Sequence, residues 1–199
     1  MNNSLVCELI CTRLSHDIVG NIGAVSNAVE LLEEGDMDFI DDIKSILSVS
    51  SKTLASRLKF FRMTFGLNNS NIENHEIVVK TAKDYLLTLG NKDFPITLDF
   101  NVQNQNNIKN AMLLVMIMGD FLIRGGNIRI GDDNNVLVAK IDKNTKLSTD
   151  KLNKTADFIN NKSACPDASL APVAALIEYN RDKKISLLQD NSYIMIVME

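Results

Sequence analysis

The first 66 residues carry an apolar pattern with helical spacing, in two segments. Apolar residues recur at three- and four-residue intervals over residues 4–34, where proline is absent and Ser4 can act as the N-cap. The same spacing runs over residues 38–65, with Gly66 at the C′ position. The sequence Glu-Glu-Gly-Asp at 33–36 separates the two segments. The pattern therefore predicts two long antiparallel helices joined as a hairpin.

Each predicted helix has one apolar stripe along its length. In the first helix, the stripe consists of Cys7, Cys11, Leu14, Ile18, Ile22, Val25, Val29 and Leu32. In the second helix, it consists of Ile40, Ile43, Leu47, Ser50, Leu54, Leu58, Phe61 and Phe65. Two helices with one stripe each do not enclose a core, so we expect two hairpins to form a four-helix bundle in a homodimer. Cys7 and Cys11 lie on the stripe, which predicts small core residues rather than a metal-binding pair.

The rest of the chain alternates between helical and strand patterns and predicts a second domain. The polar segment GLNNSNIENH at 66–75 marks the boundary, which gives a helical hairpin over 1–68 and an α/β domain over 69–199. Helices are expected at about 75–89, 106–123, 149–160 and 170–182, and strands at about 96–102, 127–131, 135–142, 185–189 and 193–198. The predicted fold class is α+β, with a helical layer on one mixed sheet.

Composition and charge exclude several classes of protein. The 199 residues carry a formal net charge of −4, which does not fit the basic face of a nucleic-acid-binding protein. No apolar run reaches the roughly 18 residues that a membrane-spanning helix needs. The N-terminal sequence MNNSLVCELIC lacks the basic residues of a signal peptide. The three cysteines have no paired spacing and indicate reduced thiols, so we expect a cytoplasmic protein.

His16, one of only two histidines, is the strongest candidate for chemistry. On the first predicted helix it points about 160° away from the core direction defined by Ile18. Its neighbours on this outer face are Arg13, Gly20, Gly23 and Asn27. Glycine inside a helix costs about 1 kcal/mol relative to alanine. The two glycines are therefore best explained by the space that they leave beside the imidazole for a partner protein.

The residues around His16 suit phosphoryl transfer. The neutral imidazole of a histidine offers a nucleophilic nitrogen near neutral pH. Asp17 can orient the ring by accepting a hydrogen bond or can take its proton, and Arg13 can hold phosphate oxygens as a bidentate donor. Transfer needs donor oxygen, phosphorus and acceptor nitrogen roughly in line, which an open helix surface allows.

The sequence RLSHDIVGNIGAVSN at 13–27, with Glu-Leu-Leu at 30–32, resembles the phosphoacceptor helix of the ChpT-type histidine phosphotransferases of alphaproteobacteria. The Leu-Ile-Arg-Gly-Gly stretch at 122–126 is similar to the helix-to-strand turn of that family. The resemblance implies a dimeric helical hairpin followed by a degenerate histidine-kinase ATPase-like domain of the Bergerat type. It also implies that His16 is the phosphoacceptor.

Two positions depart from the phosphoacceptor helices of histidine kinases. Asn21 stands where those helices usually have proline, which predicts a helix without that cause of a kink. Gly20 stands where they often have Thr, Ser or Asn, which can aim a hydrolytic water at a partner's acyl phosphate. We therefore expect little phosphatase activity.

The second domain lacks the motifs with which that superfamily binds ATP. The sequence AMLLVMIMGDFLIRGG at 111–126 contains no asparagine pair to hold magnesium. No glycine follows Gly131, so the adenine-contacting loop and the glycine-rich lid are missing. We expect no ATP, no metal and no other cofactor on this chain, with the Mg²⁺ of the reaction held by the partner's receiver domain.

These observations favour a phosphorelay intermediate. It would accept phosphate from the receiver domain of a hybrid histidine kinase and pass it to the receiver domain of a response regulator. The alternatives are a non-catalytic dimeric adaptor for receiver domains, an active histidine kinase core, and a structural coiled coil, which leaves Gly20 and Gly23 unexplained. We expect neither nucleic acid nor membrane as a partner. His75, at the start of the second domain, is expected to cap a helix or lie on the surface.

Overall fold

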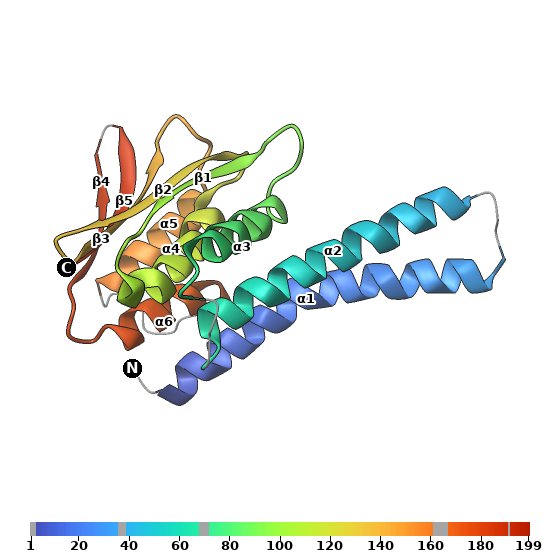
Figure 1. Cartoon of the computed structure of the whole chain (residues 1–199), viewed down its shortest axis with the longest axis horizontal. Coiled ribbons are helices and arrows are strands. Elements are labelled where there is room, and N and C mark those ends of the chain that lie inside the picture. The colour runs from blue at the N-terminus through green and yellow to red at the C-terminus, as the bar shows by residue number, and fades with distance from the viewer. Residues whose placement is uncertain (1–2, 36–38, 68–71, 161–166, 191) are drawn as a thin grey trace.

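Two long helices form the predicted antiparallel hairpin. The computed structural model describes residues 3–35, 39–67, 72–160, 167–190 and 192–199. The hairpin consists of α1 (Asn3–Glu33) and α2 (Ile40–Phe65), and its far end extends well beyond the rest of the chain (Figure 1). α1 is continuous through Asn21, as expected for a helix without proline there. After α1, Gly35 adopts a φ of +74°, a conformation that favours glycine.

The ends of the two helices differ from the sequence prediction in detail. Ser4 lies inside α1, where its hydroxyl donates to Glu8 Oε1 at 3.2 Å, so it is not the N-cap. Gly66 directly follows α2, but with φ −67° and ψ 147° it is extended rather than left-handed. The predicted start of the second helix at residue 38 lies outside the described residues, and α2 begins at Ile40.

Five strands form one mixed sheet in the order β1-β2-β3-β5-β4. They are β1 (Ile96–Asn101), β2 (Gly126–Asp133), β3 (Val136–Asp142), β4 (Ile185–Gln189) and β5 (Tyr193–Met198). β1 pairs with β2 in parallel, and the other neighbours pair antiparallel. The β2–β3 turn holds Asn134 and Asn135 at φ 47° and 68°, the left-handed pair that a two-residue hairpin turn requires and asparagine tolerates.

Four helices lie on one side of this sheet (Figure 1). They are α3 (His75–Leu87), α4 (Ile108–Phe121), α5 (Thr149–Ile159) and α6 (Ala171–Tyr179), with the short 3-10 turns η2 (Gln105–Asn107) before α4 and η3 (Ala168–Leu170) before α6. α4 is buried on nearly all sides, which explains its almost uniformly apolar sequence. The predicted α+β class, with a helical layer on a mixed sheet, is confirmed.

One apolar core joins the base of the hairpin to the helical layer. Leu9 of α1 and Phe60 of α2 belong to the same buried cluster as α4. Tyr85 of α3 stacks on Phe60, with ring centroids 3.9 Å apart. The predicted domain boundary falls in segment 66–75, of which residues 68–71 lie outside the described part of the chain. Packing between the two parts holds the first half of α1 firmly against the second domain.

The first part of the predicted α1 stripe is wrong. Cys7 and Cys11, predicted as core residues, are exposed. The reason is that α1 packs against α6 through a different face, on which Val6 and Leu9 are buried.

Further along the hairpin, the predicted stripes are only partly covered. Ala28 is buried, whereas Ile22 and Val29 of the α1 stripe are 53% and 42% exposed. In α2, Ile43 is buried as predicted, but Leu58 is 46% exposed. The single chain therefore leaves apolar surface of the α1–α2 hairpin uncovered. Among the described residues, no helix combines the length and the apolar character that crossing a membrane would require.

Candidate functional site

His16 lies on the exposed surface of α1, as the helical spacing predicts. Gly20, Gly23 and Asn27 follow on the same helix and are also exposed. A Cβ added at either glycine would meet nothing within 4 Å. The helix surface beside the imidazole is therefore open, while the roles of these residues in partner docking stay predictions.

Arg13 differs from its predicted role, because its guanidinium is already occupied. Nη1 and Nη2 donate to the two carboxylate oxygens of Asp120, each at 2.8 Å, and Nε donates to Asp17 Oδ2 at 2.9 Å. Asp120 lies near the end of α4, so this contact ties α1, the helix that carries His16, to α4. The bidentate fork that the sequence assigns to phosphate is bound to a carboxylate in the structure.

Asp17 is held at both its side chain and its main chain. Its carboxylate accepts from Arg13, and its carbonyl oxygen accepts from Nη1 of Arg57 on α2. Arg57 also donates through Nε to the hydroxyl of Thr88 at 3.2 Å, at the end of α3. Within the described ranges, no hydrogen bond joins Asp17 to His16. The helical turn that carries His16 is thus held by contacts from Arg57 of α2 and Asp120 of α4, and Thr88 in turn holds Arg57.

The surrounding carboxylates stabilise the charged form of Arg13. Burial alone lowers the pKa of Arg13, but its hydrogen bonds to Asp120 and the charges of Asp120 and Asp17 outweigh burial and raise that pKa overall. Lys151 of α5 adds a second cation, with Nζ 3.6 Å from Asp120 Oδ1. Burial and the charge of Asp120 raise the pKa of Tyr85, whose buried hydroxyl has no hydrogen-bond partner in the described part of the chain.

Asp120 is the site residue that the sequence prediction missed. It stands as the one charged residue in the apolar run AMLLVMIMGDFLI at 111–123. A carboxylate in such a helix needs a partner, because an unpaired buried charge is very costly. That signal indicates a paired residue, but it does not identify Arg13 as the partner.

Asparagines around the start of α4 make structural contacts. Asn110 and Asn180 are buried and exchange side-chain hydrogen bonds at 2.9 Å, while Asn107 donates to Asp132 at 3.0 Å. Asn106 and Asn110 do have the N-x-x-x-N spacing, just ahead of the segment in which the sequence predicts no asparagine pair. A cavity between α4, α5 and α6 has a volume of about 10 Å³, which is room for about one water molecule.

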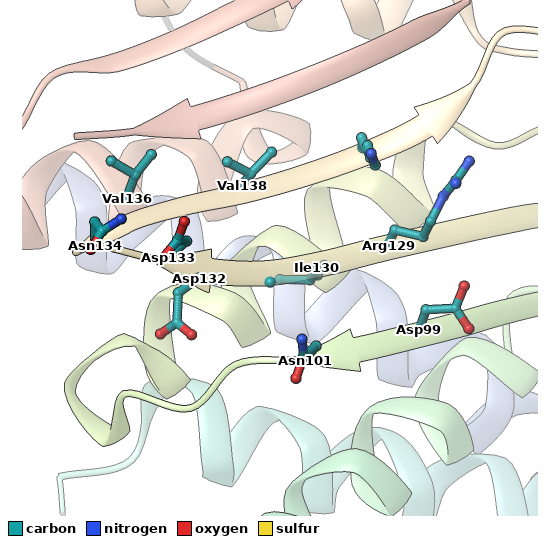
Figure 2. A pocket seen from close by; sticks show the side chains of 11 residues that line it. Asp99, Asn101, Arg129, Ile130, Asp132, Asp133, Asn134, Val136 and Val138 are labelled. Atoms are coloured by element: carbon teal, nitrogen blue, oxygen red, sulfur yellow. The ribbon is translucent and has the colours of Figure 1, made fainter.

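A larger cavity of about 700 Å³ lies on the sheet face that points away from the helices (Figure 2). Asp99 and Asn101 of β1, Arg129 of β2 and Val136 and Val138 of β3 line it. None of the residues that the sequence predicts for the site lies there. The cavity therefore belongs to a different surface from the one that carries His16.

His75 is the first residue of α3 and is exposed. The helix is capped by the preceding Asn74, whose side chain accepts from the Ile77 amide at 3.1 Å. The His75 ring lies 5.9 Å from the ring of Phe100, centroid to centroid. His75 therefore has the surface position that the sequence predicts.

Comparison with known proteins supports the resemblance and the fold. The chain is 40% identical over 62 residues, 31% of its length, to the protein phosphotransferase ChpT of Brucella abortus (strain 2308), and the match spans 29% of that relative. A solved structure described as a bacterial phosphotransferase overlays with a TM-score of 0.76 at 23% identity, over 100% of this chain and 98% of that one. A histidine kinase domain from Erythrobacter litoralis EL346 overlays with a TM-score of only 0.43 at 10% identity, over 94% of each chain. No family model matches the chain. The predicted resemblance to a ChpT-type protein is confirmed, and the whole-chain overlay confirms the fold.

Proposed function

We propose that this ChpT-like chain is a histidine phosphotransferase of a two-component phosphorelay, with His16 carrying the phosphoryl group between receiver domains. The observation that carries the proposal is an exposed His16 in an R-L-S-H-D sequence, beside a helix surface that Gly20 and Gly23 leave open. In-line transfer requires the acceptor nitrogen to approach phosphorus opposite the leaving oxygen. A projecting imidazole on an open helix meets that requirement.

The proposed chemistry is a reversible exchange between a carboxylate and an imidazole. The unprotonated nitrogen of His16 forms a P–N bond as the P–O bond to the receiver's aspartate breaks, and that aspartate leaves as a free carboxylate. The second ring nitrogen keeps its proton, so the ring gains positive charge. The neighbouring carboxylate of Asp17 favours that charge. Onward transfer reverses the same bonds at a second receiver, and the Mg²⁺ of each step belongs to the receiver.

We propose that the phosphate comes from another protein rather than from ATP. One observation favours a kinase, namely the N-x-x-x-N spacing of Asn106 and Asn110. Against it, the Asn110 amide is paired with Asn180, and the cavity next to Asp120 and Lys151 is about 10 Å³. Ligand pockets of nucleotide size usually measure about 300–1,000 Å³. The sequence after Gly131 contains no glycine, which also argues against ATP binding.

The proposed assembly is a homodimer formed by the two hairpins. Ile22 and Val29 of α1 and Val49 and Leu58 of α2 are between 42% and 61% exposed on the single chain. Burial of apolar surface stabilises an assembly by about 25 cal/mol per Å². A second hairpin can bury this surface along the length of α1 and α2. We propose cytoplasmic receiver domains as the other partners, one from a hybrid kinase and one from a response regulator.

The test is transfer of phosphate from a receiver domain that carries a radiolabelled aspartyl phosphate. We expect acid-labile label on the wild-type chain and none on His16→Ala. His75→Ala removes the only other histidine and should label like the wild type. If the wild type binds the receiver but takes no label, the chain is an adaptor rather than a phosphotransferase.

A further inference from the structure

The Arg13 guanidinium lies between two carboxylates, one helical turn from His16. It forks onto Asp120 with both distances at 2.8 Å and donates to Asp17 at 2.9 Å. The Arg13 and Asp120 side chains are each 11% exposed, so solvent and salt screen this pair less than a surface ion pair. In this state the positive charge of Arg13 is neutralised by carboxylates and is not available to His16.

A phosphoryl group on His16 would compete for the same guanidinium. Residues three apart on a helix are neighbours, with Cβ atoms about 5–6 Å apart, so phosphoryl oxygens on His16 come within reach of Arg13. A guanidinium binds phosphate with the same bidentate fork that it offers a carboxylate. Arg13 must release Asp120 to make that contact. Lys151, whose side chain is 40% exposed and whose Nζ lies 3.6 Å from Asp120, can then neutralise the released carboxylate.

We propose that Asp120 sets how strongly His16 retains a phosphoryl group, by competing with that group for Arg13. The inference rests on the proposed function of His16. Asp120 is a positioning residue, because it acts through Arg13 and does not touch the transferred group. Because Asp120 competes for Arg13, the phosphoryl group on His16 gains only part of the stabilisation that a free guanidinium would give it. Its P–N bond is then readily exchanged for the P–O bond of a receiver aspartate.

The test measures the equilibrium of phosphate between His16 and a receiver. A response-regulator receiver domain is charged with labelled acetyl phosphate and Mg²⁺, freed of the donor, and mixed with the full chain until the label distribution is constant. Asp120→Asn should raise the ratio of phosphorylated to free His16 by about three- to tenfold. The lower figure corresponds to the effect of a screened ion pair, and the upper figure to that of a bidentate charge-assisted contact. A structural defect that slows docking of the receiver changes only the rate at which equilibrium is reached, so it does not raise the ratio of phosphorylated to free His16.

Two comparisons separate the proposed effect from a general change in charge. Arg13→Gln should lower the ratio, and adding Asp120→Asn to it should change nothing further, because Asp120 acts only through Arg13. Asp142→Asn is the matched control. Asp142 also pairs with an arginine, Arg129, but on the sheet. That variant should leave the ratio unchanged.

The outcomes that overturn the proposal are distinct from those that overturn the proposed function. A ratio for Asp120→Asn equal to or below that of the wild type overturns the role of Asp120. If that variant does not fold, Lys151→Gln decides. This variant removes the second cation beside Asp120, so Asp120 binds Arg13 more strongly and the ratio of phosphorylated to free His16 should fall about twofold. An unchanged ratio refutes the competition for Arg13. A wild-type chain that takes no acid-labile label at His16 overturns the proposed function, and this inference with it.

Discussion

Replacement of Gly23 by leucine separates the stability of α1 from its use as a docking surface. A Cβ at this position meets nothing within 4 Å, so the substitution fits the single chain without strain. Glycine costs about 1 kcal/mol in a helix interior relative to alanine, and leucine is close to alanine. Gly23→Leu should therefore stabilise the protein by up to about 1 kcal/mol. For a chain of this size that corresponds to a rise of about 2–4 °C in melting temperature.

The same leucine should obstruct a receiver domain that approaches His16. A displacement of about 1 Å in the reacting groups can slow a reaction about 100-fold, so we expect Gly23→Leu to slow transfer about 10- to 100-fold. Circular dichroism measures the melting temperature, and single-turnover transfer from a labelled receiver measures the rate. Gly23→Ala should gain stability with little loss of rate, and Ser45→Leu, at an exposed position on α2, should leave the rate unchanged. A Gly23→Leu chain that transfers at the wild-type rate would refute the docking role of this surface.

Three further predictions test the assembly, the source of phosphate and the direction of the chemistry. Leu54→Glu combined with Leu58→Glu should convert the proposed homodimer into monomers or aggregates, because two charges enter its apolar surface. A wild type that sediments as a stable monomer at micromolar concentration contradicts the assembly. Titration with ATP and Mg²⁺ should give no binding heat, and a micromolar affinity in calorimetry would overturn the prediction that the chain does not bind ATP. His16→Ala should leave the lifetime of a phosphorylated receiver unchanged, because Gly20 has no side-chain amide or hydroxyl to position a water. Dephosphorylation well above the spontaneous rate would identify a true phosphatase.

Local sequence signals predicted most elements of the fold. The turn Asp-Asp-Asn-Asn at 132–135 predicted the β2–β3 hairpin, and the structure places Asn134 and Asn135 in the left-handed conformation that such a turn needs. The closing strands at 185–189 and 193–198 match β4 and β5 in both bounds. These elements are short and bounded by polar turn residues, so the local pattern alone defines them.

The apolar stripe of α1 shows where periodicity alone fails. A single core direction, centred on Ile18, assumes that one face of the helix makes all its contacts. In the structure, the first turns of α1 bury Val6 and Leu9 where the helix packs against α6. Further along, Ala28 is buried where α1 runs beside α2, while Ile22 stays 53% exposed. A helix with several partners has several buried faces, and their average direction describes none of them well.

The contact between Arg13 and Asp120 could not be predicted from the local sequence pattern. The two residues are 107 positions apart, and each alone looks like a different feature: a phosphate-binding arginine and an isolated acid in an apolar helix. Only the tertiary packing of α1 against α6, which itself packs against α4, brings them together. A bidentate Arg–Asp pair that is 11% exposed on both sides resists separation, because either partner alone would be a poorly solvated charge. We therefore propose that α1 carries a cation, Arg13, whose availability to His16 depends on Asp120 of the predicted second domain. A domain for which we expect no ATP chemistry would then act on His16 through the carboxylate that it places against Arg13.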